Sequence, residues 1–192
     1  MSRIELFKHF VKKPGEIGAI CPSSPILAKT ITSEIDIEKA STVVEIGPGT
    51  GIFTESIIPN LRPDANFFVI ELNSDLHSFF QEKFPEIKAY NNCASELSGI
   101  MKKEKVKSID VIISGLPWAS FPSDLQNEVL GTIFDSLAPG GVFTTFAYLQ
   151  GFLMKGAHRF RALLKEKFDT VETSKTVWRN FPPAFVYRCR KK

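Results

Sequence analysis

The chain has 192 residues, which is enough for one domain with a substantial core and too few for two ordinary domains. Hydrophobic residues make up 43% of it and charged residues 23%, as in folded globular proteins, and this excludes a mainly disordered chain. The formal net charge is only +3, so the composition does not by itself predict nucleic-acid binding.

Other sequence signals exclude several further classes. No run approaches the ~20 apolar residues of a membrane-spanning helix, and the first residues lack the uninterrupted apolar core of a signal peptide. Cys21, Cys93 and Cys189 are isolated, and the three histidines form no H-x-x-x-H pair. Neither a disulfide framework nor a metal site is predicted, and we expect a cytoplasmic protein.

We expect residues 1–30 to form an N-terminal segment that begins with an amphipathic helix. Within residues 3–13, polar and apolar side chains separate at helical spacing, with Ile4, Leu6, Phe7, Phe10 and Val11 on the apolar face. Such a short cationic helix can lie in the headgroup layer of an anionic membrane. It can also pack on the domain as a lid over a ligand, and both roles are compatible because a lid can open onto a membrane.

Residues 42–51, Thr-Val-Val-Glu-Ile-Gly-Pro-Gly-Thr-Gly, are the most informative stretch. A short β-branched run predicts a buried parallel strand. Glycines at alternate positions 47, 49 and 51 then leave no Cβ atoms where the backbone approaches a ligand. The dinucleotide fingerprint is G-x-G-x-x-G, whereas this loop reads G-x-G-x-G with Glu45 two residues ahead. The alternative is that the loop is only a tight turn between a strand and a helix.

A second acid follows about 20 residues later. Residues 66–72, Asn-Phe-Phe-Val-Ile-Glu-Leu, form another buried-strand pattern that ends in Glu71. An acid at the end of the second strand of a Rossmann-like sheet can accept hydrogen bonds from both hydroxyls of a ribose. The pair of motifs therefore predicts a nucleoside cofactor, although Glu71 could also be a solvated strand end.

The rest of the chain alternates between the two periodicities. Strands are predicted over 86–90, 109–113, 141–148, 170–178 and 184–189, and helices over 74–83, 123–137 and 155–168. This alternation predicts an α/β fold with a doubly wound sheet and helices on both faces. Ligands of such sheets bind beyond the carboxyl ends of the strands, so the glycine loop, Glu71 and residues 114–118 should converge on one cleft.

The C-terminal residues Arg188, Arg190, Lys191 and Lys192 are basic. Such a run is usually a solvated tail. Together with the N-terminal lysines it could also form a face attracted to an anionic membrane, at about 1 kcal/mol per residue near the surface.

With these residues assembled, the chain resembles the bacterial phospholipid N-methyltransferases, which belong to the class I S-adenosylmethionine (SAM) methyltransferases. The likeness runs nearly end to end and rests on residues 18–24 (Gly-Ala-Ile-Cys-Pro-Ser-Ser), 44–51, 114–117 (Ser-Gly-Leu-Pro) and 180–184 (Asn-Phe-Pro-Pro-Ala). The resemblance implies one methyltransferase domain over residues 1–192, with a Rossmann-like seven-stranded sheet whose last strand is antiparallel. It further implies SAM as cofactor and methyl transfer to the amine of phosphatidylethanolamine, or its methylated derivatives, by a peripheral membrane enzyme without an obligate protein partner.

The motifs and the resemblance together assign the site. Cofactor contacts are expected from Glu45, Gly47, Gly49, Thr50, Gly51, Glu71, Leu72, Ala94, Ser95, Ser114 and Gly115. Substrate contacts are expected from Ser24, Leu116, Pro117, Trp178, Asn180 and Phe181. Tyr148 is the candidate proton acceptor, and Trp118 is the candidate aromatic contact of a methylated amine through cation–π attraction.

One departure from the family pattern affects the adenine site. Where the family has Gly-Asp-Ala after the third strand, this chain has Asn92-Cys93-Ala94, and a cysteine cannot replace a carboxylate acceptor. Adenine contacts would then come from the backbone of Ala94, from Ser95 or from Glu96. This departure also admits a catalytically silent SAM-binding protein.

The nearest competing enzymes are the adenine methyltransferases of ribosomal RNA. They carry an Asn-Pro-Pro-aromatic motif after the fourth strand, whereas this chain has Ser114-Gly115-Leu116-Pro117-Trp118. The leucine removes the second polar position of that motif, so we expect nucleic acid not to be the substrate. An RNA or small-molecule N-methyltransferase on the same fold is the alternative.

Overall fold

A computed structural model of the chain describes residues 23–192. The predicted amphipathic helix over residues 3–13, and residues 18–22 of the first family motif, lie outside this range. None of the helices in residues 23–192 is long and apolar enough to cross a bilayer.

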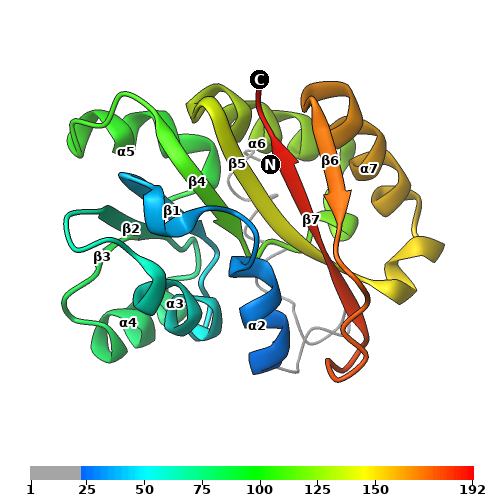
Figure 1. Cartoon of the computed structure of the whole chain (residues 1–192), viewed down its shortest axis with the longest axis horizontal. Helices are drawn as coiled ribbons and strands as arrows, with labels where there is room; N and C mark the ends of the chain where they lie inside the picture. Colours follow the sequence, from blue (N-terminus) through cyan, green and yellow to red (C-terminus); the bar gives the residue numbers. More distant parts are fainter. Residues whose placement is uncertain (1–22) are drawn as a thin grey trace.

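Seven strands form one sheet in the order β3-β2-β1-β4-β5-β7-β6 (Figure 1). Their bounds are β1 Thr42–Ile46, β2 Asn66–Ile70, β3 Lys88–Tyr90, β4 Ile109–Ser114, β5 Leu137–Tyr148, β6 Thr170–Thr173 and β7 Ala184–Arg190. The pairings among β1 to β5 are parallel, whereas β7 runs antiparallel to both β5 and β6. The doubly wound sheet with an antiparallel last strand, as predicted, is confirmed.

The helices cover both faces of the sheet, and each face has its own core. Their bounds are α2 Pro25–Thr32, α3 Ile52–Ile57, α4 Ser74–Lys83, α5 Leu97–Lys103, α6 Ser123–Ser136 and α7 Lys155–Lys167. One core contains buried residues of α5, α6 and α7, and the other contains those of α2 and α3. Alternate residues of β1 enter the two cores, since Val44 and Ile46 join the first and Val43 joins the second, which follows from the two-residue period of a strand.

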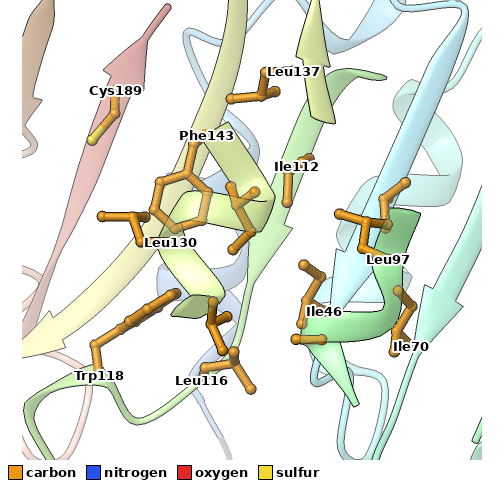
Figure 2. Packing of buried hydrophobic residues seen from close by; sticks show 14 of the residues in the cluster. Ile46, Ile70, Leu97, Ile112, Leu116, Trp118, Leu130, Leu137, Phe143 and Cys189 are labelled. Carbon is orange, nitrogen blue, oxygen red and sulfur yellow. The ribbon is translucent and has the colours of Figure 1, made fainter. Parts of the chain in front are cut away.

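The larger core extends to the loop after β4. Figure 2 shows Leu97, Ile46 and Ile70 at one end of this cluster, Phe143 and Leu130 near its centre, and Leu116 and Trp118 at its lower margin. The loop that follows β4 is therefore attached to the core by two large side chains. This attachment fixes the position of the loop relative to the strand ends.

Two predicted strand boundaries were wrong by about four or five residues, and the other strand boundaries differ by one or two. β5 begins at Leu137 rather than at 141, because Leu137 already pairs with Ile109 of β4, and the register then shifts before Val142 pairs with Val111. β6 ends at Thr173 rather than at 178, and beyond it only Val177 forms an isolated bridge, with Ala184. The helix α5 was not predicted, because it has only seven residues.

The basic C-terminus lies at the edge of the sheet opposite the carboxyl ends of β4 and β6 (Figure 1). Arg188 is buried, where its guanidinium donates to backbone carbonyls of Thr30 and Ser33 and pairs with Glu34. The ammonium of Lys191 donates to two backbone carbonyls near the end of α6. These two side chains therefore have partners within the chain, whereas Arg190 and Lys192 are exposed. Attraction of this end to an anionic membrane stays a prediction.

The start of α7 is packed tightly against the loop after β4. A Cβ atom added at Gly156 would lie 2.1 Å from the carbonyl oxygen of Ala119, whereas one added at Gly131, in α6, would meet nothing within 4 Å.

Gly156→Ala should therefore destabilise the protein by about 1–3 kcal/mol because the added methyl overpacks this contact. Gly131→Ala is the matched control and should stabilise it by roughly 0.5–1 kcal/mol, since alanine is the better helix former. Urea unfolding measures both changes, and a Gly156→Ala protein as stable as the parent would contradict the packing described.

Candidate functional site

The glycine loop follows β1 and takes backbone angles that suit glycine. Gly47, Gly49 and Gly51 have φ values of +71°, +56° and +82°, in the left-handed region that costs other residues free energy. A Cβ at Gly49 would meet no atom of the protein within 4 Å, whereas a Cβ at Gly51 would lie 2.3 Å from the ring of Phe84. Gly49 thus leaves space beside the backbone, and Gly51 permits the loop to pack against the chain beyond α4.

Glu71 lies at the end of β2, beside this loop. Its carboxylate accepts hydrogen bonds from the backbone N–H of Gly49 at 3.1 Å and from that of Asn73 at 2.9 Å. The residue is only 3% exposed, and burial raises the pKa of the carboxyl group. Each carboxylate oxygen has a further lone pair, so the group can still accept two hydroxyl donors, as a ribose would supply.

A cavity of about 380 Å³ opens between the strand ends. Its walls come from the glycine loop, the ends of β2 and β3, the loop after β4, the end of β5 and the start of α7. Of the predicted site residues it is lined by Gly47, Gly49, Thr50, Glu71, Leu72, Ala94, Gly115, Leu116, Pro117, Trp118 and Tyr148. The separate sequence signals therefore converge on one cavity.

Glu45 is placed differently from the prediction. The residue is completely buried, and it does not line the cavity. One carboxylate oxygen accepts from the Thr54 hydroxyl of α3 at 2.5 Å, and the other has no partner among the described residues. Glu45 connects β1 to α3 behind the glycine loop, where it can support the loop rather than contact a ligand.

Gly51, Ser95 and Ser114 also do not line the cavity. Ser114 ends β4 and is buried, and its hydroxyl accepts from the indole N–H of Trp118 at 3.2 Å. Ser95 donates to the thiol of Cys93 at 3.1 Å. These three residues shape the loops around the cavity, and a direct cofactor contact from them stays a prediction.

Of the predicted substrate residues, Ser24 and Asn180 have structural partners. The amide oxygen of Asn180 accepts from the backbone N–H of Ser24 at 2.8 Å, and its nitrogen donates to the carbonyl of Pro182. Asn180 is buried, so it attaches the start of α2 to the β6–β7 connection. Trp178 and Phe181 do not line the cavity and are 72% and 81% exposed.

The acceptor end of the cavity is aromatic. Trp118 stacks on Phe160 with ring centroids 4.5 Å apart, and Phe160 meets Tyr187 edge-on at 6.2 Å. All three line the cavity, as does Tyr148. Tyr187 and Phe160 were missed in the sequence because they fit the ordinary apolar patterns of a strand and a helix. Phe121, by contrast, is buried and does not line the cavity.

Charge is nearly absent from this cavity. Among the described residues that line it, Glu71 is the one with a charged side chain. Residues 23–192 also contain no group of three or more His, Cys, Asp or Glu residues that could hold a metal ion. The arrangement suits a nucleoside held by backbone and carboxylate, with apolar and aromatic walls beyond it.

Comparison with known proteins gives the class. The chain superposes on the O-methyltransferase TomG from Streptomyces achromogenes, solved in complex with SAM, with a TM-score of 0.72 at 15% identity, covering 100% of this chain and 91% of that one. The sheet, the G-x-G-x-G loop at Gly47 to Gly51 and the acid at the end of β2 are those of a class I methyltransferase. Together with the sequence relatives described next, these features show that the protein is a SAM-dependent methyltransferase of that class.

The family follows from the sequence. The ornithine lipid N-methyltransferase of Singulisphaera acidiphila is 32% identical over 184 residues, which cover 94% of this chain and 92% of that protein. The chain belongs to the bacterial phospholipid N-methyltransferase family that its motifs indicate, and that relative is a lipid-methylating homologue.

A second similarity concerns the cofactor half. Residues 23–104 match the family model of ribosomal RNA adenine dimethylases. Ribosomal RNA small subunit methyltransferase A of Sulfurihydrogenibium sp. is 29% identical over 110 residues, which cover 56% of this chain and 42% of that protein. The family-model match ends before β4, so it does not include the loop at residues 114–118.

Burial of Glu45 creates a pH dependence of stability. Because burial outweighs the hydrogen bond from Thr54, the pKa of Glu45 rises from 4.5 to about 8. Between these values the folded protein keeps a proton that the unfolded chain has lost, so the free energy of unfolding falls as pH rises, by up to about 1.4 kcal/mol per pH unit.

Glu45→Gln, which cannot titrate but can still accept from Thr54, should make the free energy of unfolding less dependent on pH between 5 and 8. Urea unfolding without ligand at several pH values gives the two slopes. A residual slope is expected from Glu71, whose pKa is also raised. Identical slopes in the parent and the variant would contradict this account.

Proposed function

We propose that the protein transfers methyl groups from SAM to the amine of a membrane lipid, at the surface of the membrane. The acceptor is the headgroup of phosphatidylethanolamine, its methylated derivatives or an ornithine lipid. The observation that carries the proposal is the acceptor end of the cavity, which is walled by Trp118, Phe160 and Tyr187 and has no cationic side chain among the residues described.

Aromatic walls suit the chemistry of repeated amine methylation. Each transfer makes the headgroup nitrogen a better cation for an aromatic face and a poorer hydrogen-bond donor, and a good cation–π contact contributes about 0.5–2 kcal/mol. The loop after β4 has Leu116 where the Asn-Pro-Pro-aromatic motif of the RNA adenine methyltransferases has its second polar position. This difference favours a lipid amine over RNA.

The main catalytic task of the chain is positioning. When bound, SAM supplies a methyl group on a positively charged sulfur, so a neutral amine placed in line needs little further activation. Leu116 and Pro117 from the loop after β4, together with the aromatic rings, exclude water and restrict the position of the amine. Burial raises the pKa of the Tyr187 phenol, and this neutral group is proposed to orient the headgroup. Tyr148 is the proposed proton relay, because its phenol oxygen can accept the ammonium proton while its own proton passes to water.

Exposed apolar side chains lie beside this end of the cavity. Met154 lines the cavity, and its neighbour Leu153 is 91% exposed. Leu153 ends the 3-10 helix η6, Leu149–Leu153. The backbone N–H of Leu149 donates to the carbonyl of Pro183, which belongs to the connection between β6 and β7. The same connection contains the exposed rings of Trp178 and Phe181. Side chains of this kind can enter a lipid headgroup layer, so we propose this edge, together with residues 1–13, as the membrane-facing surface of a cytoplasmic, peripherally associated enzyme.

Leu153→Asp combined with Phe181→Asp should weaken binding to lipid vesicles at least about tenfold, since a buried Leu or Phe side chain contributes roughly 1.5–3 kcal/mol. SAM affinity should not change. Ile58→Asp, at an exposed apolar residue of the 3-10 helix η3 (Ile58–Asn60), is the matched control. Vesicle co-sedimentation and titration calorimetry make the two measurements, and full vesicle binding by the double variant would remove this surface from the proposal.

The acceptor is identified by supplying SAM with a labelled methyl group. Phosphatidylethanolamine vesicles, ornithine lipid vesicles, small-subunit ribosomal RNA and a mixture of small amines are offered separately, with phosphatidylcholine vesicles as the blank. We expect the label in one or both amine lipids, and the stronger of the two defines the headgroup. Label confined to RNA or to the small amines would overturn the proposal.

A further inference from the structure

We infer that Asn92 recognises the amino group of the cofactor's adenine, in place of the carboxylate that the family motif carries one residue later. The inference builds on the use of SAM and does not depend on the methyl acceptor. Asn92 follows the end of β3, and the comparison with the family motif does not identify it as an adenine contact.

The position of the adenine follows from the two ends already assigned. The glycine loop and Glu71 hold the middle of the cofactor, and the loop after β4 lies at the methyl-transfer end. Because β2 and β3 lie on the opposite side of β1 from β4, the lining residues that follow β2 and β3, which are Leu72, Leu76, Asn92 and Ala94, lie away from the methyl-transfer end. The two leucines offer apolar surface to the flat faces of a purine. The polar edge of the purine then needs a hydrogen-bond partner from another residue.

Cys93 is not placed to form a hydrogen bond with the polar edge of the purine. Its side chain is only 3% exposed and does not line the cavity. Its sulfur accepts from the Ser95 hydroxyl, and Cys93 precedes the 3-10 helix η4, Ala94–Glu96. The thiol is therefore turned toward the protein, and a weak acceptor there could not replace a carboxylate in any case.

Asn92 has the required acceptor, and its amide is held in one orientation. The amide nitrogen donates to a carboxylate oxygen of Glu96 at 3.0 Å, and the same oxygen accepts from the backbone N–H of Cys93 at 3.1 Å. These donors keep Glu96 ionised, because they lower the pKa of its carboxyl group. With the nitrogen thus engaged, Oδ1 is the atom of the Asn92 amide that can accept from the 6-amino group of adenine.

The same geometry predicts discrimination against a purine with oxygen at position 6. A 6-oxo group is an acceptor and would face another acceptor, Oδ1, while Glu96 opposes rotation of the amide. Two facing acceptors share no hydrogen bond, so the analogue loses the contact that the 6-amino group makes with Oδ1. Asn92 should therefore distinguish adenine from hypoxanthine in the cofactor.

The test measures binding by titration calorimetry with S-adenosylhomocysteine and with S-inosylhomocysteine, which has a 6-oxo group in place of the 6-amino group and an N1–H in place of the N1 acceptor. The parent protein should bind the adenosyl compound at least about tenfold more tightly. Asn92→Leu should weaken adenosyl binding about 3–10-fold, the value of one hydrogen bond, and leave inosyl binding equal or improved, so that most of the discrimination disappears. Glu96→Gln should improve inosyl binding, because the Asn92 amide can then rotate.

Ser98→Ala, at an exposed residue of α5 that does not line the cavity, is the control and should leave both affinities unchanged, and Ser95→Ala is measured beside it. Urea unfolding establishes that each variant is folded. Unchanged discrimination in Asn92→Leu would overturn the inference and leave recognition to the backbone of Ala94. Loss of discrimination in Ser95→Ala, with none in Asn92→Leu, would assign the contact to Ser95.

Discussion

The hydrogen bond from the backbone N–H of Gly49 to the carboxylate of Glu71 is the contact on which the site depends. It joins the loops that follow two neighbouring parallel strands, β1 and β2, and so fixes the separation of the backbone and the acid that must both contact one nucleoside. The contact forms only because Gly49 adopts a positive φ and because Glu71 is buried beside it. The cost of burying that carboxylate is offset in part by the two backbone donors.

The sequence was sufficient for the fold because its signals were local and repeated. The central strands β1, β2 and β4 are mainly apolar, as expected when helices cover both faces, and α4 was predicted over its full extent, Ser74–Lys83. Boundaries failed where tertiary pairing overrode local signals. Pro139 and Gly140 lie within β5 at its shift in register, although neither residue is typical of a strand. Residues 174–178 have strand-like composition but pair only at Val177.

The candidate site was predictable on the cofactor side and less so on the acceptor side, for a physical reason. Backbone contacts require glycine at fixed positions, and this leaves a sequence motif. Aromatic walls require only that large side chains from distant elements meet in the folded chain. Tyr187 on β7 and Phe160 on α7 therefore belong to no sequence motif that could have predicted their place in the cavity. Glu45 was assigned to the ligand because its spacing suited that role, whereas its bond to Thr54 could be seen only once α3 was placed.

The position of β7 between β5 and β6 determines the order in which these strands can pair during folding. β6 pairs with β7 and with no other described strand, and β7 lies between it and β5. A ribosome delivers Thr170–Thr173 before Ala184–Arg190, so the earlier segment has no neighbour to join until the later one has emerged. The parallel part of the sheet can assemble earlier, but β6 joins the sheet only after β7 has emerged. Until then the edge of β5 is unpaired and can pair with a strand of another molecule.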